Sequence, residues 1–434
     1  MSTVSQLAAA LQTVFTTTAE DAARQTGFIR RQRNVSGPGF AQALTFGWLS
    51  NPDATLCELA GHPALGITAQ GLEQRFTSNA SEFLRTVLLS ATQQAIAADP
   101  VAIPLLRKFT SVRLLDSTTI ALPAALTNLW PGCTGAAIKL QVTLDYATGQ
   151  LAGLDFAPGR ENDNASAAQR ASIPAGSLRI ADLGYFRQET FAEIQKAGAY
   201  WLSRLKVGVA VADAHGKPVQ DIPAWLKSQP AGPIDLPIQL GGKHGLKARL
   251  LAVRAPAAVV EERRRKLHEW AKDKGCPVSA RRLAMAEWTT MVTNAPATLL
   301  NVAETLVLAK VRWQIELLFK LWKQHGKLDQ SRSEKPWRVL CEVYAKLLGL
   351  VVQHWALILG GWRNANRSMV KASRLVRGFA LMLAIGLSRP SLLKPALRAV
   401  LDAVRSADRI CKSKKTPRSF ALLRDPDLIL DGLT

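Results

Sequence analysis

Hydrophobic and polar residues follow the period of an α-helix over the first quarter of the chain. In the runs "GFAQALTFGWLS" and "ASEFLRTVLLSATQQAIA", apolar residues recur three and four positions apart, which is the spacing of a helix with one buried face. We therefore expect residues 1–105 to form a helical region. The same period returns near Ala297 and dominates to the end of the chain, so residues 346–434 are also predicted to be helical.

Between these regions the pattern changes to that of β-strands. The runs "SVRLLDSTTIALP", "AIKLQVTLDYATGQLAGLDFAP" and "SLRIADLGYF" are short, apolar and bounded by Gly, Pro, Asn and Thr, as strands are. Within the second run, "DYATGQ" predicts a hairpin turn around Thr148 and Gly149. The segment "NASAAQRAS" predicts a helix before the last of these strands. Residues 106–206 are thus predicted to be the first part of a mixed α/β domain.

A stretch rich in Gly and Pro follows, over residues 207–290. It alternates strand-like runs such as "KARLLAVRA" with one strongly basic helical segment, "EERRRKLHEW". We interpret it as an inserted β-rich subdomain. Residues 291–345 then complete the α/β domain. The predicted fold class is therefore a multidomain α/β protein with helical regions at both ends.

One helical stretch, "VRWQIELLFKLWK" from Val311 to Lys323, carries three polar residues in an apolar run. On an α-helix Arg312, Glu316 and Lys323 stack along one side. The apolar residues on the neighbouring side are Val311, Ile315, Leu318 and Trp322. The row of charges has two interpretations: a surface ion pair between residues four apart, worth about 0.3 kcal/mol, or a carboxylate presented to a metal site.

Composition favours a polyanionic partner. The chain has 434 residues, 48% hydrophobic and 20% charged, with 55 Lys and Arg against 33 Asp and Glu and a formal net charge of +22. These proportions are typical of a globular protein rather than a disordered one. An excess of positive charge favours phosphate backbones through the release of counterions. An anionic lipid surface would gain from the same charge, but we favour nucleic acid.

No segment predicts a membrane span, a secretion signal or a zinc ribbon. The most apolar run, residues 347–362, is shorter than the roughly 20 residues that a span needs and has Gln353 and His354 at its middle, so it predicts a buried helix. The N-terminus lacks a basic n-region. The five cysteines show no CxxC spacing, which argues against zinc ribbons and disulfide frameworks. We expect a cytoplasmic protein without a membrane partner.

Two acidic residues end predicted strands and are candidate partners of Glu316. Asp116 follows the apolar run in "VRLLDST", and Asp182 follows the one in "LRIADLGYF". Each alone is equally typical of a turn or of a helix N-cap. If both strands end at the same edge of the sheet, and the helix turns Glu316 towards it, the three carboxylates converge.

Three neighbouring carboxylates repel one another unless cations lie between them. Hard oxygen ligands of this kind select Mg²⁺ or Mn²⁺. Two such ions, about 3.5 to 4 Å apart, activate a water or a 3′-hydroxyl for in-line attack on phosphorus. The acidic residues therefore predict phosphodiester cleavage and transfer, with Arg312 and Lys323 placed to hold the flanking phosphates.

The motifs "LLDSTTI", "IADLGYF" and "RWQIELLFKLWK" resemble the three signature regions of the DDE transposases of bacterial insertion sequences, specifically the insertion-sequence-four group that includes the transposon-five transposase. The resemblance implies a ribonuclease H-like core, a β-rich insertion, and Asp116, Asp182 and Glu316 as the catalytic metal ligands. In that group a Tyr precedes the Arg of the Glu helix and helps to bind phosphate. Ala309 stands at the Tyr position here.

The resemblance also implies how DNA is bound and processed. Trp288 lies 28 residues before Glu316, where a relative stacks a Trp on a base flipped out of the duplex; the alternative is a core Trp at the start of a strand. By the same resemblance residues 1–105 bind the terminal inverted repeats, and residues 346–434 help two subunits to pair in a synaptic complex. The further candidates for contacts with double-stranded DNA, each with an ordinary surface or ion-pair role as the alternative, are Arg30, Arg31, Arg33 and Arg204.

The resulting hypothesis is a transposase that excises an element through a hairpin intermediate and joins it to target DNA. The resemblance also implies a bacterial protein that associates with the nucleoid when it binds DNA. Two alternatives belong to other classes. One is a DNA-binding protein derived from such an enzyme but catalytically inactive. The other is a ribonuclease H-like nuclease that cleaves DNA without transferring strands.

Overall fold

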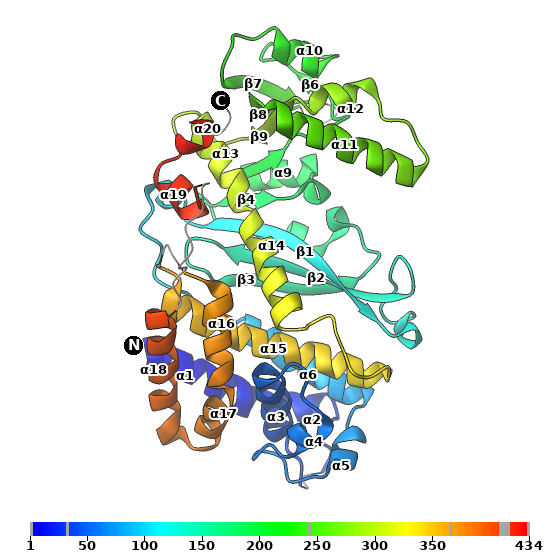
Figure 1. The fold of residues 1–434 in the computed structure, drawn as a ribbon, viewed down its shortest axis with the longest axis vertical. Helices are drawn as coiled ribbons and strands as arrows, with labels where there is room; N and C mark the ends of the chain where they lie inside the picture. The colour runs from blue at the N-terminus through cyan, green and yellow to red at the C-terminus, as the bar shows by residue number, and fades with distance from the viewer. Residues whose placement is uncertain (1–2, 32–33, 242–244, 365–366, 408–416, 432–434) are drawn as a thin grey trace. The chain divides into compact units, whose positions relative to one another are not determined.

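The computed structural model describes residues 3–31, 34–241, 245–364, 367–407 and 417–431 (Figure 1). The chain divides into two compact units. The first comprises residues 1–101, 117–161 and 315–412, and the second comprises residues 102–116, 162–314 and 413–434. Strand β1 (Val112–Leu122) and helix α14 (Trp313–Lys320) each contribute residues to both.

The first unit is mainly helical. Its helices are α1 (Thr3–Thr13), the π-helix η1 (Val14–Thr18), α2 (Ala19–Gln25), α3 (Gly37–Ser50), α4 (Leu56–Ala60), α5 (Ala69–Glu73), α6 (Ser78–Thr92), the 3₁₀ turn η2 (Ala124–Leu126), the π-helix η6 (Leu321–His325), α15 (Pro336–Gly361), α16 (Met369–Gly378), α17 (Ala380–Ser388) and α18 (Pro390–Ala407). The N-terminal and C-terminal helical regions pack together here, because α15 lies against both α3 and α6.

Helix α15 is the centre of this unit. Pro336 opens the helix, where its missing N–H costs no hydrogen bond. Nearly every residue from Val339 to Ile358 is buried. Among the described residues it is the one helix long and apolar enough to cross a membrane by length and composition, but its burial is that of a core helix. This confirms the prediction of a buried helix around residues 347–362.

The first unit also holds the predicted hairpin. Strands β2 (Ala136–Asp145) and β3 (Leu151–Pro158) pair antiparallel. Gly149 has φ +75°, which a residue with a side chain adopts only with strain. The turn rests on α15, where His354 Nε2 lies 2.7 Å from the Gly149 carbonyl oxygen. The hairpin prediction from "DYATGQ" is thereby confirmed.

The second unit is built on a mixed sheet, which confirms the predicted mixed α/β class. Its strands after β1 are β4 (Leu178–Ala181), β5 (Tyr200–Arg204), β6 (Val211–Ala212), β7 (Ile234–Leu240), β8 (Leu246–Arg254) and β9 (Trp288–Thr293). Their order in the sheet is β1-β4-β5-β9-β8-β7-β6. Strands β1, β4 and β5 are parallel, whereas β9, β8, β7 and β6 continue the sheet antiparallel.

The second unit also contains helices and 3₁₀ turns. They are α7 (Pro104–Arg107), the 3₁₀ turn η3 (Asp163–Ala165), α8 (Ala167–Arg170), the 3₁₀ turn η4 (Leu183–Tyr185), α9 (Gln188–Lys196), α10 (Ile222–Lys227), α11 (Ala257–Lys274), α12 (Ala280–Met285), α13 (Val302–Val311), α19 (Ser419–Arg424) and α20 (Leu428–Asp431). The described part of residues 207–290 thus contains α10, α11 and α12 as well as strands β6 to β8. Figure 1 shows α11 next to β9, where Arg263 Nη1 of α11 donates to the Trp288 carbonyl oxygen at 3.0 Å. The strands extend the sheet through β9, which pairs with β5.

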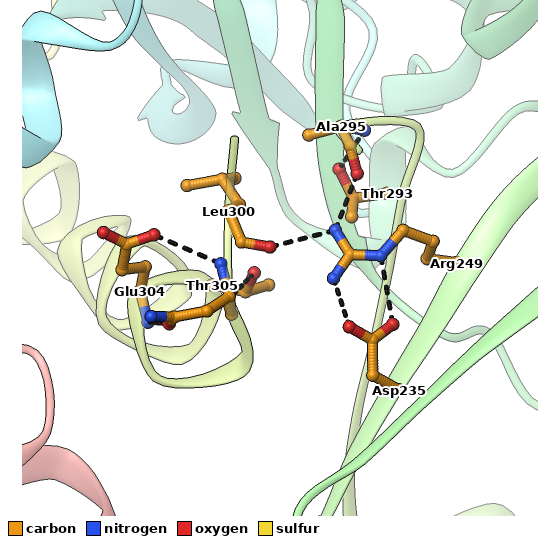
Figure 2. A network of polar contacts seen from close by, with 8 residues as sticks. Asp235, Arg249, Thr293, Ala295, Leu300, Glu304 and Thr305 are labelled. Carbon is orange, nitrogen blue, oxygen red and sulfur yellow. Dashed lines mark hydrogen bonds and ion pairs between the residues drawn. The ribbon is translucent and has the colours of Figure 1, made fainter. Parts of the chain in front are cut away.

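A polar network fixes the chain just before α13 (Figure 2). Arg249 forms an ion pair with Asp235 on the adjacent strand. Its Nη1 also donates to the carbonyl oxygens of Ala295, at 2.7 Å, and Leu300, at 3.0 Å. A capping box between Asn301 and Glu304 then starts α13. The helix that leads to Arg312 is therefore anchored directly to the sheet.

Candidate active site

Asp116 and Asp182 lie at the same level of neighbouring strands. Strands β1 and β4 run parallel, with Leu115 paired to Ala181, so an aspartate comes next on each side. Asp182 directly follows the end of β4 as predicted, but β1 continues to Leu122, so the prediction that Asp116 ends its strand is wrong. Asp182 precedes the turn η4 but makes no side-chain capping bond. Its side chain has no hydrogen-bond or ion-pair partner among the described residues. The turn and N-cap alternatives therefore do not account for this carboxylate.

Asp116 forms an ion pair within the second unit. Arg312 Nη1 donates to Asp116 Oδ2 at 3.0 Å, and the two side chains are 22% and 17% exposed. Arg312 ends α13 in a helical conformation, and α14 follows it directly. The guanidinium that the sequence predicts to hold a DNA phosphate thus binds one of the two neighbouring carboxylates, Asp116.

A cavity of about 620 Å³ opens beside Asp182 in the second unit. Its polar lining includes Ser203 and the cationic side chains of Arg204, Lys310 and Arg312. Its apolar lining residues are Ile180, Ala181, Leu202, Val253, Met291, Leu306, Ala309, Trp313 and Ile429. The cavity combines three cations and one free carboxylate with apolar walls, as a site for a phosphate and the nucleoside attached to it would require.

Arg204 and Lys310 are the free cations of this cavity. Both are exposed, and neither forms an ion pair with a carboxylate among the described residues. The ion-pair alternative for Arg204 therefore has no partner here. The sequence analysis did not predict a role for Lys310. The available hint was a second basic residue only two positions before Arg312.

Glu316 lies in the first turn of α14, four residues after Arg312, and belongs to the first unit. Lys323 falls in η6, where Nζ donates to the Thr119 carbonyl oxygen at 2.8 Å. The sequence predicts a regular α-helix through Lys323, but Leu321–His325 is π-helical. Since a π turn is wider than an α turn, the offset of seven residues does not stack Lys323 on Glu316 as a regular helix would. The apolar side is buried as predicted, at Val311, Ile315, Leu318 and Trp322.

No group of three or more His, Cys, Asp or Glu side chains that could hold a metal ion occurs among the described residues. The side chains of Asp116 and Asp182 nevertheless provide the kind of ligand that a hard divalent cation prefers. Asp116 and Asp182 supply carboxylate oxygens from adjacent strands, and such oxygens are the ligands that Mg²⁺ and Mn²⁺ prefer.

Trp288 begins β9 and is only 6% exposed. It packs in the hydrophobic core of the second unit, with Met285 and Val292. The Arg254 guanidinium lies 5.4 Å from its ring centroid. A base stacked on Trp288 would therefore have to displace Arg254.

In the first unit, a second cationic cavity of about 650 Å³ is lined by Arg30, Arg31 and Arg75. The three arginines have no carboxylate partner among the described residues, and Ser78 at the start of α6 lies on its wall. Arg33 lies outside the described residues. The contribution of Arg75 was not foreseen, since it comes from a segment 44 residues beyond Arg31; the helix-start signal "FTSN" directly after it was the available hint.

Comparison with known proteins identifies the family of the chain. The transposase DDE domain family matches residues 107–352, more than half of the chain. The transposase for insertion sequence element IS231F of Bacillus thuringiensis subsp. israelensis is 30% identical over 361 residues, covering 76% of this chain and 75% of the relative.

Two further relatives give the same assignment. The transposase for insertion sequence element IS231B of Bacillus thuringiensis subsp. berliner is 28% identical, covering 77% of this chain and 75% of its own length. The transposase for insertion sequence element IS1151 of Clostridium perfringens is 25% identical and covers 76% of each chain. The matched region includes Asp116, Asp182 and Glu316. The chain therefore belongs to the DDE transposases of insertion sequences.

Proposed function

We propose that this protein cleaves DNA at the ends of an insertion sequence and joins those ends to target DNA by two-metal-ion phosphoryl transfer. The observation that carries the proposal is the pairing of Leu115 with Ala181, which puts Asp116 and Asp182 next to each other, one within β1 and one directly after β4. Both lie, with Glu316, inside the region matched by the transposase DDE domain. The proposed core is ribonuclease H-like, in agreement with the parallel arrangement of β1, β4 and β5.

Asp116, Asp182 and Glu316 would hold two Mg²⁺ or Mn²⁺ ions. Bound there, the ions supply Lewis acidity and lower the pKa of a water or hydroxyl nucleophile. The chain itself keeps the carboxylates in register. Asp182 is exposed and available. Arg312 offsets the negative charge of Asp116 and so reduces the repulsion between neighbouring carboxylates.

Double-stranded DNA is the proposed partner, both as terminal inverted repeats and as target. Arg204 and Lys310 face the cavity beside Asp182 and would hold the phosphates that flank the reacting bond. Arg312 would exchange its bond to Asp116 for a phosphate, and Lys323 would contact the DNA strand from η6, the turn that follows α14. Arg30 and Arg31 would bind the backbone of the element's end from the N-terminal helices. Trp288 would stack on an extruded base once Arg254 moves.

We further propose a cut-and-paste reaction with a hairpin intermediate, carried out by a homodimer in a synaptic complex. The pairing surface is expected on the C-terminal helices. Leu381, Met382, Ile385 and Leu392 of α17 and α18 are large apolar side chains between 37% and 53% exposed. Exposed apolar patches of this kind are typical of protein interfaces.

The test is cleavage of a labelled linear DNA that carries the element's own ends and flanks, with Mg²⁺ or with EDTA. Wild-type protein is compared with Glu316→Gln, which keeps the side-chain volume and removes the charge. Mg²⁺-dependent nicking, hairpin formation and end joining by the wild type alone support the proposal. Binding without nicking by the wild type would instead support an inactive DNA-binding protein, and nicking without joining would support a nuclease.

A further inference from the structure

A buried chain of hydrogen bonds holds the turn that follows Asp182. Gln169 of α8 donates from Nε2 to the Tyr185 carbonyl oxygen at 2.7 Å. The Tyr185 amide in turn donates to the Asp182 carbonyl oxygen at 3.0 Å. On the other side of Gln169, Arg179 Nη2 donates to Oε1. One glutamine thus joins strand β4, through Arg179, to the turn that leaves it.

The donor and acceptor chemistry of these groups fixes the direction of each hydrogen bond. A guanidinium only donates, so the carbonyl oxygen of Gln169 must face Arg179 and its amide nitrogen must face Tyr185. Gln169 is 2% exposed and Arg179 is 7% exposed. Arg179 has no carboxylate partner among the described residues, and burial lowers its pKa to about 10. A buried cation bound to an uncharged amide is costly, which suggests that the amide is needed for a purpose other than charge pairing.

Hydrophobic packing also connects the segment of Gln169 to the residues that precede the two aspartates. Leu115, Ala168 and Tyr185 form a small buried cluster with Ala181 against it. Leu115 and Ala181 are the residues directly before Asp116 and Asp182. The segment that carries Gln169 therefore supports the residues directly before both aspartates, through Ala168 in the cluster and through the hydrogen bond to Tyr185.

The turn also lies close to the segment that precedes α8. A Cβ added at Gly184 would lie 2.9 Å from Asp163 Oδ2, in the turn η3 just before α8. The backbone after Asp182 is therefore in close contact with the same segment that supplies Gln169.

We propose that Gln169 and Arg179 are positioning residues that hold Asp182 in the orientation needed to bind a divalent cation. This inference rests on the proposed function, in which Asp182 is a metal ligand. Gln169 acts through the Tyr185 peptide and touches neither the metal nor DNA. Partners of metal ligands typically change metal affinity by about 10- to 100-fold when they are lost.

The experiment is Mn²⁺ binding by calorimetry to the full chain without DNA, with thermal unfolding measured in EDTA. Gln169→Glu keeps an acceptor for Arg179 and adds an opposite charge, but an ionised carboxylate cannot donate to Tyr185. We expect its unfolding temperature in EDTA to match or exceed the wild type, while its Mn²⁺ affinity falls by about tenfold or more. Gln169→Leu, which loses both bonds, is expected to lower both quantities.

Gln195→Glu is the matched control, because Gln195 is an exposed residue of α9 in the same unit. An equal loss of Mn²⁺ affinity in this control would overturn the inference, since added charge alone would then explain the result. Wild-type Mn²⁺ affinity in both Gln169 variants would overturn it as well. Asp182→Ala separates the two levels: unchanged Mn²⁺ binding in that variant would overturn the proposed function itself.

Discussion

Arg312 and Asp116 form an ion pair, 3.0 Å between Nη1 and Oδ2, that joins the end of α13 to strand β1. Both side chains are less than one quarter exposed, so water screens the pair less than it would at the surface. The pair places a cation beside Asp116, one of the two neighbouring carboxylates. The guanidinium therefore offsets part of the repulsion between Asp116 and Asp182.

Replacing Arg312 tests that arrangement. We expect Arg312→Ala to reduce DNA cleavage by about 10- to 100-fold, because a hydrogen bond to a charged group is worth about 1.5 to 3 kcal/mol. Arg312→Lys keeps the charge without the planar fork and should recover part of the loss. Initial cleavage rates at saturating DNA give the comparison. Full activity in Arg312→Ala would contradict a role for the pair in the reaction.

The parts of the site that the sequence predicts are those with a local signal. Asp116 and Asp182 each follow an apolar run, and parallel pairing of the two runs is enough to bring them together. The hairpin is also predicted by a local signal, because its turn needs one residue with a positive φ, and Gly149 supplies it. The buried side of the Glu helix follows from helical period alone.

The parts that were missed depend on packing between distant segments. Arg75 lies in the turn between α5 and α6 and lines the same cavity as Arg30. The packing that brings these two distant segments together cannot be read from the local sequence around either residue. Gln169 and Arg179 meet because α8 packs against β4. The π turn at Lys323 was missed for another reason: its residues have an ordinary helical pattern, and only the hydrogen bonds of the folded backbone distinguish it.

The hairpin turn of the first unit offers a stability test with a close control. In Gly149→Ala the new Cβ would lie 2.7 Å from both Ile358 Cγ2 and Trp362 Cδ2. Gly135 has nearly the same φ, +76° against +75°, but nothing within 4 Å of an added Cβ. Both alanines suffer the backbone strain, about 1 to 2 kcal/mol. Only Gly149→Ala adds overpacking, about 1 to 3 kcal/mol.

We therefore expect Gly149→Ala to have the lower free energy of unfolding of the two, measured by denaturant titration of the first unit's helical signal. The difference between the variants isolates the contact with α15. Equal values for the two variants would show that the turn does not press on Ile358 and Trp362.

The buried His354 predicts a loss of stability in mild acid. It is 1% exposed, and burial is the main cause that lowers its pKa to about 4 from the ordinary 6.5. Since Nε2 lies 2.7 Å from a carbonyl oxygen, the neutral ring must carry its proton there and donate it. Between pH 6.5 and about pH 4, His354 is therefore protonated in the unfolded chain but neutral in the folded chain.

Stability from this residue is thus complete above about pH 6.5 and falls by about 1.4 kcal/mol per pH unit until the folded pKa near 4. Unfolding titrations at several pH values should show this slope, and His354→Gln should remove its share while it lowers stability at neutral pH. A slope that is unchanged in His354→Gln would assign the acid sensitivity to other groups.

The cationic cavity of the N-terminal helices predicts a distinct salt dependence for DNA binding. Arg30, Arg31 and Arg75 line it without carboxylate partners among the described residues. Each arginine that neutralises a phosphate releases counterions, so its removal lowers the slope of log affinity against log salt by about 1. We expect Arg75→Ala to weaken binding of the element's end and to lower this slope by that amount. Arg24 is the control, because its guanidinium is 2.8 Å from Glu20 and its charge is already balanced. If Arg24→Ala lowers the slope as much as Arg75→Ala does, general positive charge rather than the cavity binds the DNA backbone.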